Sequence, residues 1–112
     1  IDEKTLCIFV SQSGETADIY KQIENAYRNR IATILITGNP NSSIAKISTV
    51  VLSTLSEEFS ILTDALNSRI SQFCLIDALF SMISIKDANR MIPRLQETRN
   101  TFKKYKIEQN NL

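Results

Sequence analysis

The 112-residue chain contains no histidine and no tryptophan, and it has only two residues each of glycine, proline and cysteine. The absence of histidine removes the commonest general acid–base group and the commonest metal ligand. The two cysteines have no Cys-x-x-Cys or metal-ligand spacing, which predicts free thiols in a reducing compartment. There is no GxGxxG and no lysine-containing phosphate loop, so we expect neither a cofactor nor a metal.

Charge and hydropathy set two further limits. The formal net charge is +1, from 13 basic and 12 acidic residues, which gives no long-range field toward nucleic acid or a membrane surface. No segment has the roughly 20 uninterrupted apolar residues of a membrane span. The length is that of one domain, and because the sequence begins at Ile1 rather than Met, we expect a fragment of a longer protein.

Hydrophobic patterning predicts an α/β fold. Short apolar runs alternate with segments of helical spacing, which favours a parallel sheet joined by crossover helices. The last helix contains Pro93, which we expect in its first turn, where a missing N–H costs nothing. The expected elements are strand 4–12, helix 16–30, strand 31–38, a short helix from Ser42 or Ser43 to Ile47, strand 49–55, helix 64–85 and helix 92–105.

The expected helix at 64–85 is apolar around nearly its whole circumference. Its segment "FCLIDALFSMISI" has ten apolar residues in thirteen. A helix of this kind is central in a domain or packs on two partners at once. We therefore expect a homodimer or higher assembly, with an interface that includes Phe73, Ile76, Phe80 or Ile83.

The segment "SQSGET" joins the first expected strand to the first expected helix. N–H groups at the start of a helix lack backbone partners, and with the helix dipole they form an anion site. Ser11, Ser13 and Thr16 add hydroxyl donors, Gln12 adds an amide, and Gly14 allows a positive φ or a close backbone approach. Such a loop suits a phosphate monoester, although the same residue types also form ordinary turns and caps.

"SQSGETADI" resembles the signature loop of the sugar isomerase (SIS) domain family, with S-x-S-G-x-T matched from Ser11 to Thr16. The resemblance implies a three-layer, flavodoxin-like fold in which a five-stranded parallel sheet lies between helices. Aligned by this loop, residues 1–112 resemble the C-terminal three-fifths of such a domain, with three of its five strands. It also implies that Ser11, Gln12, Ser13, Gly14 and Thr16 bind the phosphate of a sugar phosphate.

A second segment, "NSRISQFCLIDALFSMI", is similar to a helix of the SIS domains in RpiR-type transcriptional regulators. This resemblance implies a cytoplasmic regulator that senses a phosphorylated sugar and binds DNA through an N-terminal helix-turn-helix domain. Nothing in residues 1–112 resembles that DNA-binding domain. The residues that fit the family pattern are Arg69, Ile70, Gln72, Leu75, Ile76, Asp77 and Leu79.

Two other functions stay open at this point. An aldose–ketose isomerase or a sugar-phosphate transferase needs a base beside the substrate, and without histidine the candidates are Glu57 and Glu58, just past the third strand. These carboxylates equally suit binding of sugar hydroxyls or capping of the next helix. The third function is a dimerisation domain that has lost its ligand, which the intact loop argues against.

Overall fold

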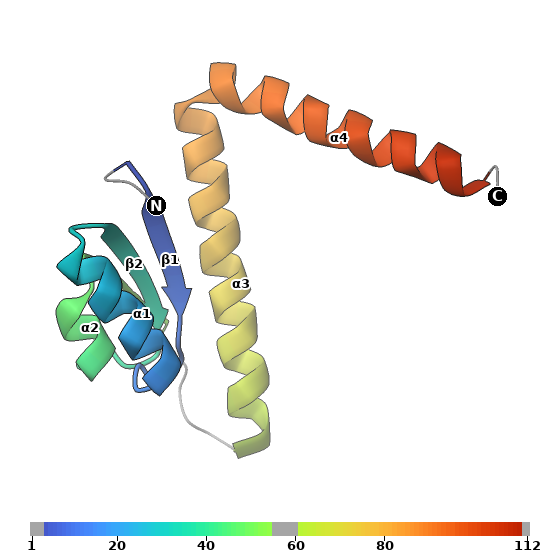
Figure 1. The fold of residues 1–112 in the computed structure, drawn as a ribbon. Helices are drawn as coiled ribbons and strands as arrows, with labels where there is room; N and C mark the ends of the chain where they lie inside the picture. The colour runs from blue at the N-terminus through green and yellow to red at the C-terminus, as the bar shows by residue number, and fades with distance from the viewer. Residues whose placement is uncertain (1–3, 55–60, 111–112) are drawn as a thin grey trace. The chain divides into compact units, whose positions relative to one another are not determined.

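The computed structural model of the chain describes residues 4–54 and 61–110. Within them the order and type of the elements agree with the sequence prediction (Figure 1). The chain divides into two compact units, residues 1–74 and residues 75–112, and the boundary falls within one long helix. The elements are β1 (Leu6–Val10), α1 (Ala17–Arg28), β2 (Ala32–Thr37), α2 (Ser43–Ile47), β3 (Val50–Ser53), α3 (Ile61–Lys86) and α4 (Ala88–Asn110).

The three strands form a parallel sheet in the order β1-β2-β3. The register pairs Phe9 with Leu35 and Leu35 with Val51, so three apolar side chains lie abreast on one face. Helices α1 and α2 cover this face (Figure 1). Parallel strands joined by helices confirm the predicted α/β class.

The hydrophobic core of the first unit lies between this sheet face and the two helices. Ile23 of α1, Leu35 of β2 and Ile44 of α2 are fully buried, and Ala45 joins them. Phe9 and Val51 pack against the same cluster from the neighbouring strands. The helical spacing of apolar residues in α1 thus places one stripe of that helix on the sheet, as the sequence predicted.

The opposite face of β1 is open in this chain. Leu6 and Ile8 are half exposed, and Val10 is more than a third exposed. In this chain β1 is an edge strand of the sheet, and α1 and α2 lie on its other face.

Helix α1 ends in a Schellman motif with arginine at the position that glycine usually occupies. The N–H of Arg30 donates to the carbonyl of Tyr27 (3.1 Å), and the N–H of Ile31 donates to that of Ala26 (2.9 Å). Arg30 has φ 57°, in the left-handed region. The two bonds satisfy carbonyls at the helix end, at the cost of an unfavourable backbone conformation for a residue with a Cβ.

Between α3 and α4 only Asp87 is not helical, and α4 begins earlier than the sequence predicted. The carbonyl of Asp87 accepts from the N–H groups of Arg90 and Met91, which starts a new helix at once. Pro93 therefore lies inside α4, beyond its first turn, so the predicted start at residue 92 is wrong. The local turn at Asp87, rather than the proline, sets the start of the helix.

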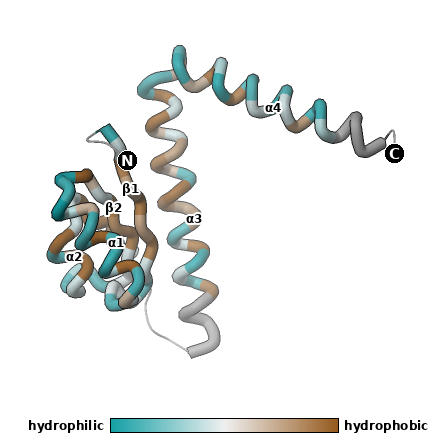
Figure 2. Tube along the Cα trace, in the orientation of Figure 1, coloured by the Kyte–Doolittle hydropathy of each residue, from teal (hydrophilic) through white to brown (hydrophobic). Residues whose placement is uncertain are grey.

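Helix α3 is rich in apolar residues, and Figure 2 shows brown segments along its described length, interrupted by teal ones. By length and composition the segment Leu66–Lys86 is able to cross a membrane, which the sequence analysis did not anticipate. Core helices of soluble proteins meet the same test, and the segment carries Arg69 and Asp77. The large apolar side chains of α3 exposed in this chain are Leu66, Ile70, Phe73, Ile76, Phe80, Met82, Ile83 and Ile85.

Candidate functional site

The loop of residues 11–16 lies where β1 ends and α1 begins, at the carboxyl edge of the parallel sheet. The N–H of Ser11 still donates to Ile36 (3.0 Å), which continues the pairing of β1 with β2 by one residue. In open α/β sheets this edge is where ligands bind. The structure thus gathers Ser11, Gln12, Ser13, Gly14 and Thr16 in one turn at the edge where a site is expected.

Ser11 is buried and organises the loop. Its hydroxyl oxygen accepts from the N–H of Gly14 (3.1 Å) and lies 2.9 Å from the hydroxyl of Thr16. Thr16 is the N-cap residue of α1, yet its side chain makes no capping bond to the helix. Among the residues that the structure describes, no side chain caps α1, so the first-turn N–H groups of this helix have no side-chain acceptor there.

Gly14 meets both conditions that the sequence suggested for it. Its φ is +67°, a conformation that residues with a side chain rarely adopt. A Cβ at this position would overlap the Cβ and Oγ of Ser42, at the start of α2. The carbonyl of Gly14 also accepts from the N–H of Ile44 (3.3 Å), so the loop packs directly on α2.

The N-terminus of α2 is neutralised from within the chain. A carboxylate oxygen of Glu15 accepts from the N–H of Ser43 (2.8 Å), and the hydroxyl of Ser42 accepts from the N–H of Ala45 (3.2 Å). The bond from the Ser43 N–H holds the pKa of the Glu15 carboxyl below its ordinary value, and the Ser43 side chain and Lys46 lower it further. Of the N-termini of α1 and α2, that of α1 has no side-chain cap among the described residues and suits an external anion.

The side chain of Gln12 is turned away from the first turn of α1. Its amide oxygen accepts from Gln72 of α3 (2.9 Å) and lies 3.5 Å from the hydroxyl of Thr54. Its amide nitrogen lies where a Cβ at position 38 would stand, so Gly38 makes room for it. Gln12 therefore ties the loop to α3 and to the end of β3, and its backbone carbonyl accepts from the N–H of Gly38 (3.0 Å).

A family model for the SIS domain matches residues 1–82. The chain belongs to the SIS domain family. It is 35% identical over 94 residues to an HTH-type transcriptional regulator of Thermotoga maritima, which covers 84% of this chain and 33% of that protein. It is 30% identical over 92 residues to the HTH-type transcriptional regulator RpiR of Escherichia coli, covering 80% of this chain and 31% of that protein. The predicted resemblance to RpiR-type SIS domains is confirmed.

Solved structures support the SIS fold of the chain. A crystal structure of a hypothetical protein aligns with a TM-score of 0.66 and 22% identity, over 78% of this chain and 50% of that one. A Listeria monocytogenes protein assigned provisionally as a sugar-phosphate isomerase aligns with a TM-score of 0.50 and 23% identity, over 75% and 47%. At these identities the alignments show the fold alone. This SIS chain spans about a third of the length of the two regulators.

The sequence predicted the loop of this SIS domain but missed the residues that support it. Gln72, Thr54, Ser42 and Gly38 are far from the loop in sequence, and a single sequence carries no signal for such pairings. Glu57 and Glu58, which the sequence analysis expected near the ligand, lie outside the described residues. In the part of the chain that the structure describes, no group of three metal-ligating side chains is close enough to hold an ion.

The geometry of the SIS loop suits binding of a phosphate monoester. The donors are neutral hydroxyl and N–H groups, and the one carboxylate within the loop, Glu15, is bonded to α2. Ser13 is exposed, and its hydroxyl oxygen accepts from the N–H of Glu15 (3.2 Å), which leaves its proton free to donate. Such donors are suited to holding a phosphate group in place and to stabilising its negative charge.

Proposed function

We propose that this SIS domain is the ligand-sensing part of an RpiR-type transcriptional regulator and binds a phosphorylated sugar at residues 11–16. The observation that carries the proposal is the uncapped N-terminus of α1, with Thr16 turned to Ser11. A helix start whose cap residue bonds elsewhere is prepared for an anion. The similarity to regulators named HTH-type and RpiR supports the regulatory role.

Recognition follows from the chemistry of the loop. The phosphate dianion accepts from first-turn N–H groups of α1 and from the hydroxyls of Ser11, Ser13 and Thr16, with the Gln12 and Gly14 backbone lining the turn. Each bond to a charged acceptor contributes roughly 1.5–3 kcal/mol. The fixed turn at Gly14 holds these donors in place before the ligand arrives, which lowers the entropic cost of binding.

The wider role follows from the relatives. In this proposal the protein acts in the cytoplasm, and DNA is bound by a helix-turn-helix domain outside residues 1–112. The domain assembles as a homodimer through the exposed apolar side chains of α3. The proposed contacts are Phe73, Ile76, Phe80 and Ile83, which are between 42% and 71% exposed in this chain.

The test is isothermal calorimetry with a panel of hexose and pentose phosphates and the matching free sugars. Replacing Ser13 and Thr16 together by Ala should weaken binding of the preferred sugar phosphate by one to a few orders of magnitude. The matched control replaces Thr98 and Thr101, whose hydroxyls donate only to carbonyls one turn earlier in α4. Unchanged affinity in the loop variant would show that the loop is structural.

The second candidate is an isomerase, since a solved structure with this fold is provisionally assigned that activity. We favour a sensor because the sequence has no histidine and Glu15 is directed toward α2. The two functions separate by NMR after incubation of the chain with hexose and pentose phosphates. A product that forms with the wild type and is lost on Glu57→Gln or Glu58→Gln would establish the enzyme instead.

A further inference from the structure

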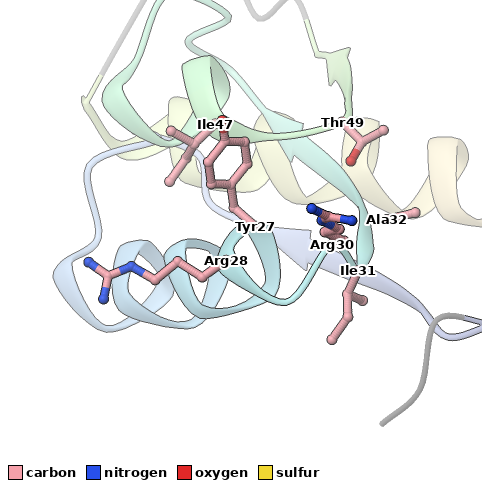
Figure 3. Close-up of a pocket in the computed structure, with 7 residues that line it drawn as sticks. All are labelled: Tyr27, Arg28, Arg30, Ile31, Ala32, Ile47 and Thr49. Carbon is pink, nitrogen blue, oxygen red and sulfur yellow. The ribbon is translucent and has the colours of Figure 1, made fainter.

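A cavity of about 540 Å³ lies at the end of β2 remote from the loop of residues 11–16 (Figure 3). It is bounded by the end of α1, the start of β2, the end of α2 and the residue before β3. Its volume falls in the range of small-molecule sites. The residues that line it are Tyr27, Arg28, Arg30, Ile31, Ala32, Ile47 and Thr49.

The charge of the cavity lining is entirely positive. Arg28 donates to Glu24 (2.9 Å), and Figure 3 shows its side chain extending away from the other lining residues. The Arg30 guanidinium lies between Tyr27 and Thr49 in the same view, and in the described part of the chain it has no acceptor. A guanidinium without a protein partner in a cavity is suited to a bidentate carboxylate or phosphate.

Several polar groups near this guanidinium already have partners within the chain. The Schellman motif uses the carbonyls of Ala26 and Tyr27, and the carbonyls of Ile44 and Ala45 at the end of α2 accept from Ser48. The hydroxyl oxygen of Thr49 accepts from the N–H of Thr33 (3.0 Å). These bonds leave the exposed guanidinium of Arg30 available to an anion in the cavity.

The backbone at Arg30 is a second, independent indication. A positive φ after a helix suits glycine, and arginine there adopts a less favourable conformation. Such an outlier at a cavity is a reason to look for function. The N–H of Arg30 donates to the carbonyl of Tyr27, so the fold fixes the backbone position from which the arginine side chain extends.

The remaining walls are apolar. Ile31, Ala32 and Ile47 line the cavity together with the ring of Tyr27, which is 65% exposed. We propose that this cavity binds a small organic anion, a phosphate or carboxylate attached to an aromatic or aliphatic ring. The anionic group pairs with Arg30, and the ring lies against Tyr27 and Ile47.

This site is separate from the one at residues 11–16. The two lie at opposite ends of β2, whose six residues place them roughly 20 Å apart. The inference goes beyond the proposed sugar-phosphate sensor and does not depend on it, because no residue is shared between the two sites.

The probe for the test is phenyl phosphate, titrated into the chain and followed by backbone amide NMR. We expect the amide signals of Ile31 and Thr49 to shift, with inorganic phosphate and benzyl alcohol each binding more weakly than the complete probe. Arg30→Asn removes the charge with a residue that tolerates positive φ. It should weaken binding about tenfold or more. Lys21→Gln, the control, removes an exposed positive charge of α1 that does not line the cavity and should leave binding nearly unchanged.

The outcomes are distinct. Shifts confined to residues 11–19 would mean that phenyl phosphate binds only at the proposed sensor site, and they would overturn this inference. Equal affinity in the wild type and Arg30→Asn would overturn it as well. The Ser13→Ala, Thr16→Ala variant should still show the shifts at Ile31 and Thr49, so failure of the sensor site is distinguishable from failure of this one.

Discussion

The hydroxyl of Thr16 lies 2.9 Å from that of Ser11 and does not cap the helix that Thr16 precedes. The N-cap threonine of a helix normally accepts from an N–H of the first turn. Here the cap residue supports the loop instead. In the proposed function, the start of α1 is left open to an external acceptor, and Thr16 contributes its hydroxyl to the binding surface.

Thr16→Val should therefore separate binding from stability. The change removes the hydroxyl and keeps the side-chain shape, so the free energy of unfolding should change by less than the ~1 kcal/mol typical of a lost cap. Ser42→Ala is the control, because Ser42 does cap α2 and its loss should cost about 1 kcal/mol. Urea denaturation measures both, and equal destabilisation by the two changes would contradict this role for Thr16.

Gly14→Ala should destabilise the first unit. The new Cβ would overlap Ser42, and alanine is disfavoured at φ +67°, so we expect a loss of about 2–4 kcal/mol. The double change Gly14→Ala, Ser42→Gly relieves the overlap and should recover part of the loss. Thermal unfolding followed by circular dichroism gives both values. A wild-type midpoint in Gly14→Ala would show that the loop has another accessible conformation.

Local chemistry made much of this structure predictable from the sequence. The spacing of apolar residues predicted which segments are strands and which are helices. The predicted need at Gly14 for a positive φ or a close approach of the backbone is confirmed. The bonds that fix the loop were not predictable, because Gln12 pairs with Gln72 sixty residues later and the geometry depends on the whole fold. Pro93 was misplaced for a related reason, since helix α4 starts from the turn at Asp87 and tolerates the proline.

The hydrogen bond from the N–H of Ser43 to the carboxylate of Glu15 should weaken in acid. Because the pKa of Glu15 is lowered in the folded state, its contribution is complete above the pKa of the unfolded chain. The contribution is lost as pH falls through the lowered folded-state value. Urea denaturation of the wild type and of Glu15→Gln should be compared from neutral to acid pH. The free energies of unfolding should differ at neutral pH, and the difference should disappear on acidification. A difference independent of pH would mean that the charge plays no part.

The bond between Gln12 and Gln72 should couple α3 to the loop. In a double-mutant cycle with Gln12→Ala and Gln72→Ala, we expect a coupling free energy of about 0.5–1.5 kcal/mol in urea denaturation. Gln72→Ala alone should also shift the amide NMR signals of Gln12 and Gly38, which Gln12 contacts. Additive single changes would show that this contact does not hold the loop.

Assembly should depend on the exposed apolar side chains of α3. At tens of micromolar, analytical ultracentrifugation should show a dimer or larger species, and Phe80→Glu should shift it toward the monomer. Phe102→Glu, at an exposed position of α4, is the control and should leave the assembly unchanged. A wild-type monomer whose α3 is covered by its own chain would refute the proposed interface.

The small core of the first unit has a consequence for how a ligand would act. Among the described residues, the fully buried large apolar side chains are few: Ile23, Leu35, Ile36 and Ile44. Proteins are stable by only about 5–15 kcal/mol, while a ligand at one hundred times its dissociation constant adds about 2.7 kcal/mol to the folded state. A ligand bound at the loop would therefore raise the free energy of unfolding of the first unit by a large fraction. If the proposed function holds, the sugar phosphate would act by lengthening the time that the domain stays folded as well as through any change of shape.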